Sequence, residues 1–154
     1  MALIEWRDEY RTGFRGIDYE HEELINQINS VYAMVEKSDA RIEIVQGLGE
    51  IYGEIAAHFA LEEQMMRRMR YSEYDEHRAD HERLLDEIRE IAEDYEESTD
   101  LDRDEFKRRL HDWFQNHFST HDARLHRLTD TQKHELISPS GLRRMIDYAK
   151  RKLR

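Results

Sequence analysis

Histidine and carboxylate side chains stand in this 154-residue chain where amphipathic helices usually carry leucine or isoleucine. A buried polar group without a partner costs roughly 1–3 kcal/mol, and a whole domain is stable by only about 5–15 kcal/mol. A bound metal removes that cost, because imidazole nitrogens and carboxylate oxygens are metal ligands. The candidate ligands are His21, His58, Glu62, His77, His81, His117 and Asp122. Seven ligands are too many for one six-coordinate ion, so this number favours two ions that share bridging carboxylates.

The spacing of these residues places most of them on inner helix faces. His58 and Glu62 are four residues apart, as are His77 and His81. On a helix such pairs share one face, with Cβ atoms about 5–6 Å apart. The end of the last helix leaves two alternatives. His121 is four residues after His117, whereas an ideal helix turns Asp122 about 140° away from His117. Periodicity favours His121, and Asp122 would need a π-bulge or a reach around the helix edge.

Four helices must position these ligands. Apolar residues at helical spacing predict helices over about 18–37, 41–70, 77–95 and 102–125, after an irregular arm over 1–17. Asp18 is the expected N-cap of the first helix, and Asp102 with Glu105 resembles a capping box at the fourth. Short connections favour antiparallel neighbours, so the expected fold is all-α: an up-down-up-down four-helix bundle. Glycines in the second helix could permit close helix approach: Gly47, Gly49 and Gly53.

Composition narrows the setting. The net charge is −11, which argues against general nucleic-acid binding. The chain contains no Cys and no apolar run of membrane-spanning length, and its first residues lack the basic and apolar regions of a secretory signal. We therefore expect a cytoplasmic protein.

The motifs together resemble the hemerythrin family, specifically its single-domain bacterial members. The similarity covers about residues 4–128 and rests on Trp6, Gly16-Ile17-Asp18-x-x-His21, His58-Phe59-x-x-Glu62-Glu63, Tyr71, His77-x-x-x-His81 and Trp113-x-x-x-His117-x-x-x-x-Asp122. The resemblance implies one iron on His77, His81 and His117, and another on His21 and His58. It also implies that Glu62 and Asp122 bridge the two irons, which selects Asp122 over His121.

By this resemblance the protein is an oxygen binder and not an enzyme. It would bind dioxygen reversibly at a non-haem, oxo- or hydroxo-bridged diiron centre, for oxygen storage, delivery or sensing. The alternative is a diiron enzyme on the same site: a peroxidase, an oxidase or a nitric-oxide-handling protein. The candidate walls of a dry oxygen pocket are Ile55, Phe59, Trp113 and Phe114. Phe114 and Phe118 stand where the family usually has Leu and Ile, so Phe114 is expected to control ligand access.

The C-terminal segment differs from the rest of the chain. Residues 139–154 hold six Lys or Arg and one Asp, on an otherwise acidic protein. We expect residues 1–130 to form the diiron bundle and 131–154 to form a basic extension with a short amphipathic helix at 141–153. That helix could fold back on the bundle or anchor the chain to an anionic membrane; we favour packing on the bundle. An oxygen carrier of this kind would serve an oxygen-consuming partner protein.

Overall fold

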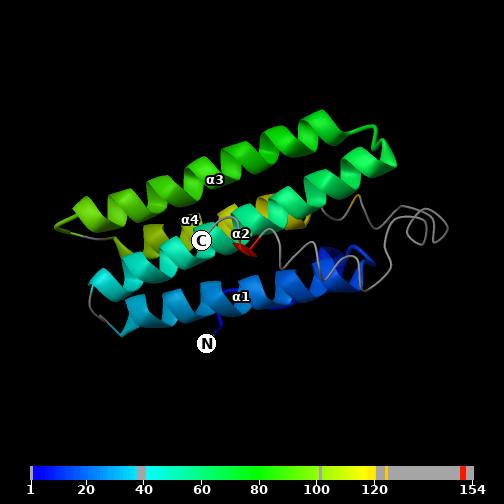
Figure 1. Cartoon of the computed structure of the whole chain (residues 1–154). Helices are drawn as coiled ribbons and strands as arrows, with labels where there is room; N and C mark the ends of the chain where they lie inside the picture. The colour runs from blue at the N-terminus through cyan, green and yellow to red at the C-terminus, as the bar shows by residue number, and fades with distance from the viewer. Residues whose placement is uncertain (1, 38–40, 101, 121–123, 125–149, 152–154) are drawn as a thin grey trace.

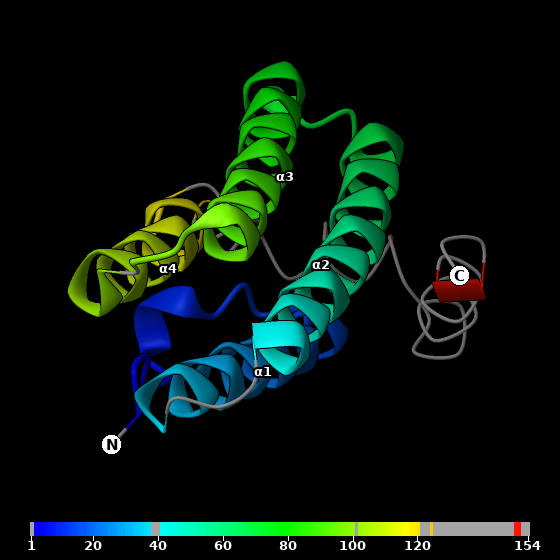
Figure 2. The same cartoon turned by 90° about the vertical axis from the view of Figure 1, so that its left-hand side faces the viewer.

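The computed structural model describes residues 2–37, 41–100, 102–120, 124 and 150–151. Its elements are a short 3-10 helix η1 (Asp8–Tyr10) and four α-helices: α1 (Arg15–Glu36), α2 (Arg41–Met69), α3 (Tyr74–Glu97) and α4 (Arg103–Phe118). Each helix packs against the next in sequence, and α4 closes the bundle against α1. Figures 1 and 2 show the four helices side by side with alternating directions, which confirms the predicted four-helix bundle.

The helix starts follow local hydrogen bonding. Asp102 is the N-cap of α4, and its side chain accepts hydrogen bonds from the backbone N–H groups of Asp104 and Glu105. The expectation that Asp18 caps the first helix is wrong, since α1 begins at Arg15 and Asp18 lies within its first turn. The Asp18 carboxylate instead accepts hydrogen bonds from the N–H groups of Thr12 and Gly13 and from the Thr12 hydroxyl. Asp18 therefore fastens the N-terminal arm to the helix.

The arm continues this attachment along the bundle. The side-chain oxygen of Asn29 on α1 accepts hydrogen bonds from the backbone N–H groups of Leu3 and Ile4, each at 2.9 Å. Its side-chain nitrogen donates to the carbonyl of Ile4. Tyr10 is buried, and its ring meets that of Phe114 on α4 edge-on, with centroids 5.2 Å apart. The arm thus closes the side of the bundle between α1 and α4.

One glycine permits a close approach of α1 and α2. A Cβ atom on Gly47 would lie 2.8 Å from Cγ2 of Val31, whereas Cβ atoms on Gly49 and Gly53 would meet nothing within 4 Å. Carbon atoms attract each other best at about 3.5–4.0 Å. Of these three positions, Gly47 is therefore the one at which the close packing of α1 on α2 requires a residue without a side chain.

The core has two apolar clusters with a polar layer between them. The larger cluster includes residues from all four helices, such as Ile28, Leu48, Ile88 and Leu110. The smaller one contains Phe14, Ile17, Leu61, Met65 and Met66. On α1, His21 lies between Ile17 of the smaller cluster and Leu24 of the larger one, and on α2 His58 and Glu62 lie where the two clusters meet. On these two helices apolar side chains therefore precede and follow the ligands.

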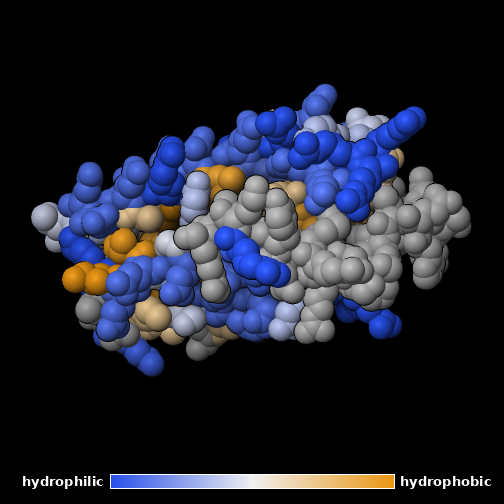
Figure 3. Space-filling view, in the orientation of Figure 1, coloured by the Kyte–Doolittle hydropathy of each residue, from blue (hydrophilic) through white to orange (hydrophobic). Residues whose placement is uncertain are grey.

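The outer surface carries the charge. In Figure 3 most of the visible described surface is hydrophilic, and hydrophobic residues show mainly in the seams between helices and at one end. In the described part of the chain, no helix is both long and apolar enough to cross a membrane. The predicted helix at 141–153 lies outside the described residues except for Lys150 and Arg151, which are helical.

Candidate metal centre

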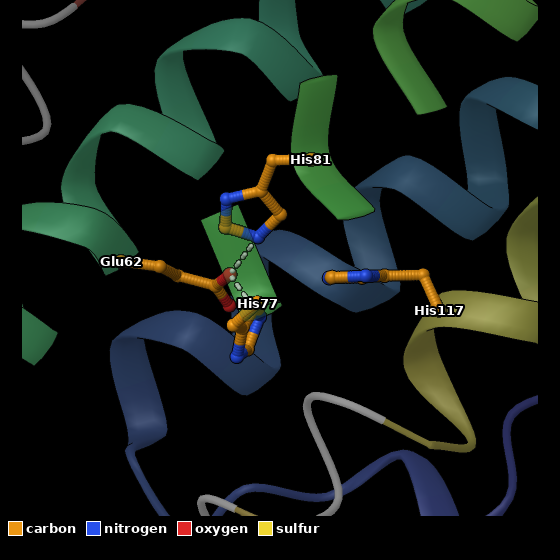
Figure 4. A group of neighbouring side chains, drawn as sticks. All are labelled: Glu62, His77, His81 and His117. Atoms are coloured by element: carbon orange, nitrogen blue, oxygen red, sulfur yellow. Dashed lines mark hydrogen bonds and ion pairs between the residues drawn. The ribbon is translucent and has the colours of Figure 1, made fainter. Parts of the chain in front are cut away.

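Six of the seven predicted ligands converge in the polar layer. Their potential ligand atoms form two groups, within each of which all such atoms lie within 4.8 Å of one another. One group is Glu62 with His77, His81 and His117, and the other is His21 and His58 with the same Glu62. Figure 4 shows the first group, with side chains from α2, α3 and α4 directed at a common point. Asp122 and the alternative His121 lie outside the described residues.

All six side chains are deeply buried. His58 is the most exposed at 5%, and the others are exposed by 1% or less. Each helix brings at least one ligand to the layer: α1 carries His21, α2 carries His58 and Glu62, α3 carries His77 and His81, and α4 carries His117. The antiparallel arrangement brings these distant positions to the same depth.

Glu62 lies between the two groups and turns one carboxylate oxygen to each. Its Oε1 is 3.0 Å from Nε2 of His58 and 3.6 Å from Nε2 of His21. Its Oε2 is 3.1 Å from Nε2 of His81 and 3.7 Å from Nε2 of His77. A carboxylate with its oxygens divided in this way can bridge two metal ions.

The electrostatics of the layer keep this carboxylate ionised. Burial alone would raise the pKa of Glu62, but its interactions with His58, His21 and His77 together hold it well below the usual value. An ionised carboxylate is the form that binds metal.

The donor set fits a pair of metal ions better than a metal-free core. Nε2 of His21 and Nε2 of His58 face each other at 2.8 Å, so a single proton must be shared between two nitrogen atoms. Five buried imidazoles around one carboxylate supply more acceptors than a closed hydrogen-bond network can use. Metal ions would take up these acceptors, three imidazoles on one side of Glu62 and two on the other.

Two further carboxylates, here called outer carboxylates, contact the Nδ1 atoms of two ligand histidines. Nδ1 of His81 is 3.0 Å from Oε1 of Glu63, and Nδ1 of His117 is 2.6 Å from Oδ2 of Asp80. Sequence reasoning had assigned neither carboxylate a role, although Glu63 adjoins Glu62 and Asp80 lies within the His77–His81 motif. Their positions inside the ligand motifs could have marked them as neighbours of the site. Each, however, contacts a histidine on another helix, and the sequence does not show that pairing.

Aromatic rings surround the ligand layer. The ring of Phe59 stacks on His81, with centroids 3.8 Å apart and an interplanar angle of 8°. Phe118 meets His21 edge-on at 4.5 Å and His117 at 5.1 Å. Sequence reasoning had not placed Phe118 in the pocket wall. This ring covers the histidines of both groups from the α4 side.

The other predicted pocket residues have more varied positions. Phe114 is buried and stacks on Phe118 at 4.2 Å, and Phe118 in turn contacts His21 and His117. Trp113 is buried and donates its indole N–H to the carbonyl of Leu84, 2.7 Å away, which ties α4 to α3. Ile55 lines a small hollow beside His58, between α1 and α2.

A basic side chain from the C-terminal segment lies over this hollow. Nζ of Lys150 is 3.5 Å from carboxylate oxygens of both Glu20 on α1 and Glu54 on α2. A neighbouring hollow is lined by Glu20, Ala57, His58, Leu61 and Lys150. At this residue, the segment contacts the bundle next to the two-histidine group.

Comparison with known proteins agrees with the geometry. Residues 12–129 match the model of the hemerythrin HHE cation binding domain. The chain is similar to the bacteriohemerythrin of Pseudomonas aeruginosa, with 28% identity over 80% of this chain and 79% of the relative. It is also similar to those of Stenotrophomonas maltophilia (27% identity; 76% of this chain, 75% of the relative) and Methylococcus capsulatus (24%; 76% and 89%). No solved structure matched significantly. With a matching family model over most of its length and a buried histidine–glutamate cluster at its centre, the chain belongs to the hemerythrin family.

Proposed function

We propose that this protein binds dioxygen reversibly at a non-haem diiron centre, for oxygen storage, delivery or sensing. The observation that carries the proposal is the divided environment of Glu62, with three histidines beside one of its oxygens and two beside the other. In this proposal His77, His81 and His117 hold one iron, His21 and His58 hold the second, and Glu62 and Asp122 bridge them. When bound, a pair of ferrous ions supplies dioxygen with two one-electron donors.

The chain's own residues define where dioxygen can enter. Three histidines fill one side of the site and two fill the other, so the position left for dioxygen is beside His21 and His58. Phe118 covers His21 there, and Ile55 packs against the hollow next to His58. Apolar walls keep water and anions away from the centre, which favours release of dioxygen over permanent oxidation of the iron.

The extent of the functional unit can be proposed from the family match and from the contacts of Lys150. We propose that residues 1–130 contain the whole diiron unit, since the family match ends at residue 129. Residues 131–154 form a basic extension in this proposal. The contacts of Lys150 with Glu20 and Glu54 support its packing on the bundle.

The test is anaerobic reconstitution with ferrous iron followed by exposure to air. We expect two irons per chain and an ultraviolet-visible change that reverses under argon. His117→Ala should lower the iron content, and His111→Ala is the matched control, because His111 is on the same helix with its side chain 37% exposed. Binding of two irons with irreversible oxidation and turnover of a substrate would instead support the enzyme alternative. Full iron loading of His117→Ala would contradict the ligand assignment.

A further inference from the structure

Asp80 connects the ligand layer to a hydrogen-bonded chain on α3. It lies between His77 and His81 in sequence, yet its Oδ2 contacts His117 on α4 at 2.6 Å. Its other oxygen accepts a hydrogen bond from Nε of Arg83 at 3.1 Å, and Arg83 also pairs with Glu87. The Asp80 side chain is only 10% exposed. The hydrogen bond from Arg83 therefore restrains the Asp80 side chain, and Asp80 restrains the orientation of the His117 ring.

This contact determines which nitrogen of His117 can bind a metal. An ionised carboxylate only accepts hydrogen bonds, so it favours the proton on Nδ1 and leaves Nε2 as the donor atom. Arg83 donates to the other oxygen of Asp80, so both carboxylate oxygens serve as hydrogen-bond acceptors in this arrangement. Glu63 has the same relation to Nδ1 of His81. Carboxylates that hold ligand histidines in this way also raise their basicity.

The two histidine groups differ in this respect. Two of the three imidazoles beside Oε2 of Glu62 have an outer carboxylate, Glu63 or Asp80. In the other group, Nδ1 of His58 is buried and forms no hydrogen bond with any described residue. Two rings of the three-histidine group are therefore held by carboxylates before any metal binds, whereas the ring of His58 is not held through its Nδ1.

We propose that Asp80 is a positioning residue that makes the three-histidine group the tighter of the two metal sites, so that this site fills first and empties last. The proposal rests on the proposed diiron function, since it assumes two ions on these ligands. Loss of an outer carboxylate of this kind typically lowers metal affinity about 10–100-fold.

The test uses the full chain loaded with Zn²⁺, a diamagnetic ion that imidazole binds well. A chelator titration should remove two zinc equivalents in two separate steps. Asp80→Asn keeps the shape of the side chain but loses its charge, and it should lower the affinity of the tighter equivalent about 10–100-fold. Asp86→Asn is the matched control: Asp86 also lies on α3 and pairs with the arginine three residues later, Arg89, but its side chain is 65% exposed.

A second readout separates positioning from a general loss of structure. Long-range ¹H–¹⁵N NMR of the histidine rings reports which nitrogen carries the proton. We expect a single Nδ1-protonated form of His117 in the parent and in Asp86→Asn. In Asp80→Asn we expect mixed forms, because the amide can donate as well as accept. If Asp80→Asn does not fold, Glu63→Gln tests the same site through His81 from α2.

The outcomes distinguish the two proposals. If the parent chain binds fewer than two metal equivalents, the proposed diiron function fails. If it binds two and Asp80→Asn leaves both affinities and the His117 tautomer unchanged, only the role of Asp80 is refuted. A loss confined to the weaker equivalent would also refute it, because the order of the sites would then be reversed.

Discussion

The close contact at Gly47 gives a quantitative test of the packing of α1 on α2. In Gly47→Ala the new methyl would lie 2.8 Å from Cγ2 of Val31, about 1 Å inside the best carbon–carbon separation. Val31 is 2% exposed, and a β-branched side chain in a helix has one strongly preferred rotamer, so it cannot turn aside cheaply. Overpacking of this kind costs about 1–3 kcal/mol.

The helix propensity of alanine opposes this cost by roughly 1 kcal/mol. Gly49→Ala gains the same propensity without the clash, because nothing lies within 4 Å of its new Cβ atom. The free energy of unfolding should therefore rise by about 1 kcal/mol in Gly49→Ala. It should be about 1–3 kcal/mol lower in Gly47→Ala than in Gly49→Ala.

Urea-induced unfolding of the metal-loaded proteins, followed by circular dichroism, measures this difference. The double variant Val31→Ala/Gly47→Ala adds a further check, since removal of Cγ2 should cancel the clash and give a favourable coupling between the two positions. Equal stabilities of Gly47→Ala and Gly49→Ala would refute the argument. The packing of α1 on α2 would then tolerate a methyl group where the structure leaves no room.

Three further predictions concern the pocket, a helix start and the C-terminal segment. Phe114→Ala should lower the free energy of unfolding by about 3–5 kcal/mol, because the ring is fully buried against Tyr10 and Phe118. It should also speed oxygen release and autoxidation in stopped-flow experiments, and unchanged rates would show that this ring does not control access. Asp102→Ala should cost about 1 kcal/mol in thermal unfolding through loss of the α4 cap, whereas Asp100→Ala should cost little. Deletion of residues 139–154 should lower the Tm, since it removes the contacts of Lys150 with Glu20 and Glu54; a truncated protein with the parent Tm would contradict packing on the bundle. Partial burial lowers the pKa of Lys150, but Glu20 and Glu54 outweigh it and raise this pKa overall. The stabilisation should therefore be complete at pH values below the usual lysine pKa, and it should disappear as the pH rises through the raised pKa.

The sequence predicted the bundle and the converging ligands because helical periodicity determines which residues face inward. His21, His58 and His77 needed no knowledge of neighbouring helices to be placed on an inner face. Glu63 and Asp80 could not be assigned in the same way, since each contacts a histidine on a different helix. The helix start at Asp18 was wrong because a local hydrogen-bonding residue can serve the preceding arm as well as the helix.

Phe118 shows a similar limit. Its position in the sequence placed it beside His117, but a neighbour in sequence points in a different direction around the helix. Its contact with His21 depends on how closely α4 approaches α1, which periodicity does not specify. The aromatic covering of the ligand layer is therefore a property of helix packing, and it became visible only in the assembled bundle.

The burial of Trp113 gives the protein an internal optical probe. The chain has two tryptophans: Trp6 in the partly exposed arm, and Trp113 in the core four residues before His117. At a rise of about 1.5 Å per residue, the Trp113 backbone lies only about 6 Å along α4 from that ligand. Its indole is fixed by the Leu84 carbonyl and screened from water, so its emission should be blue-shifted relative to that of Trp6. A metal ion bound by His117 would lie within quenching distance, and the fluorescence of the unlabelled chain would then follow metal uptake separately from movement of the arm.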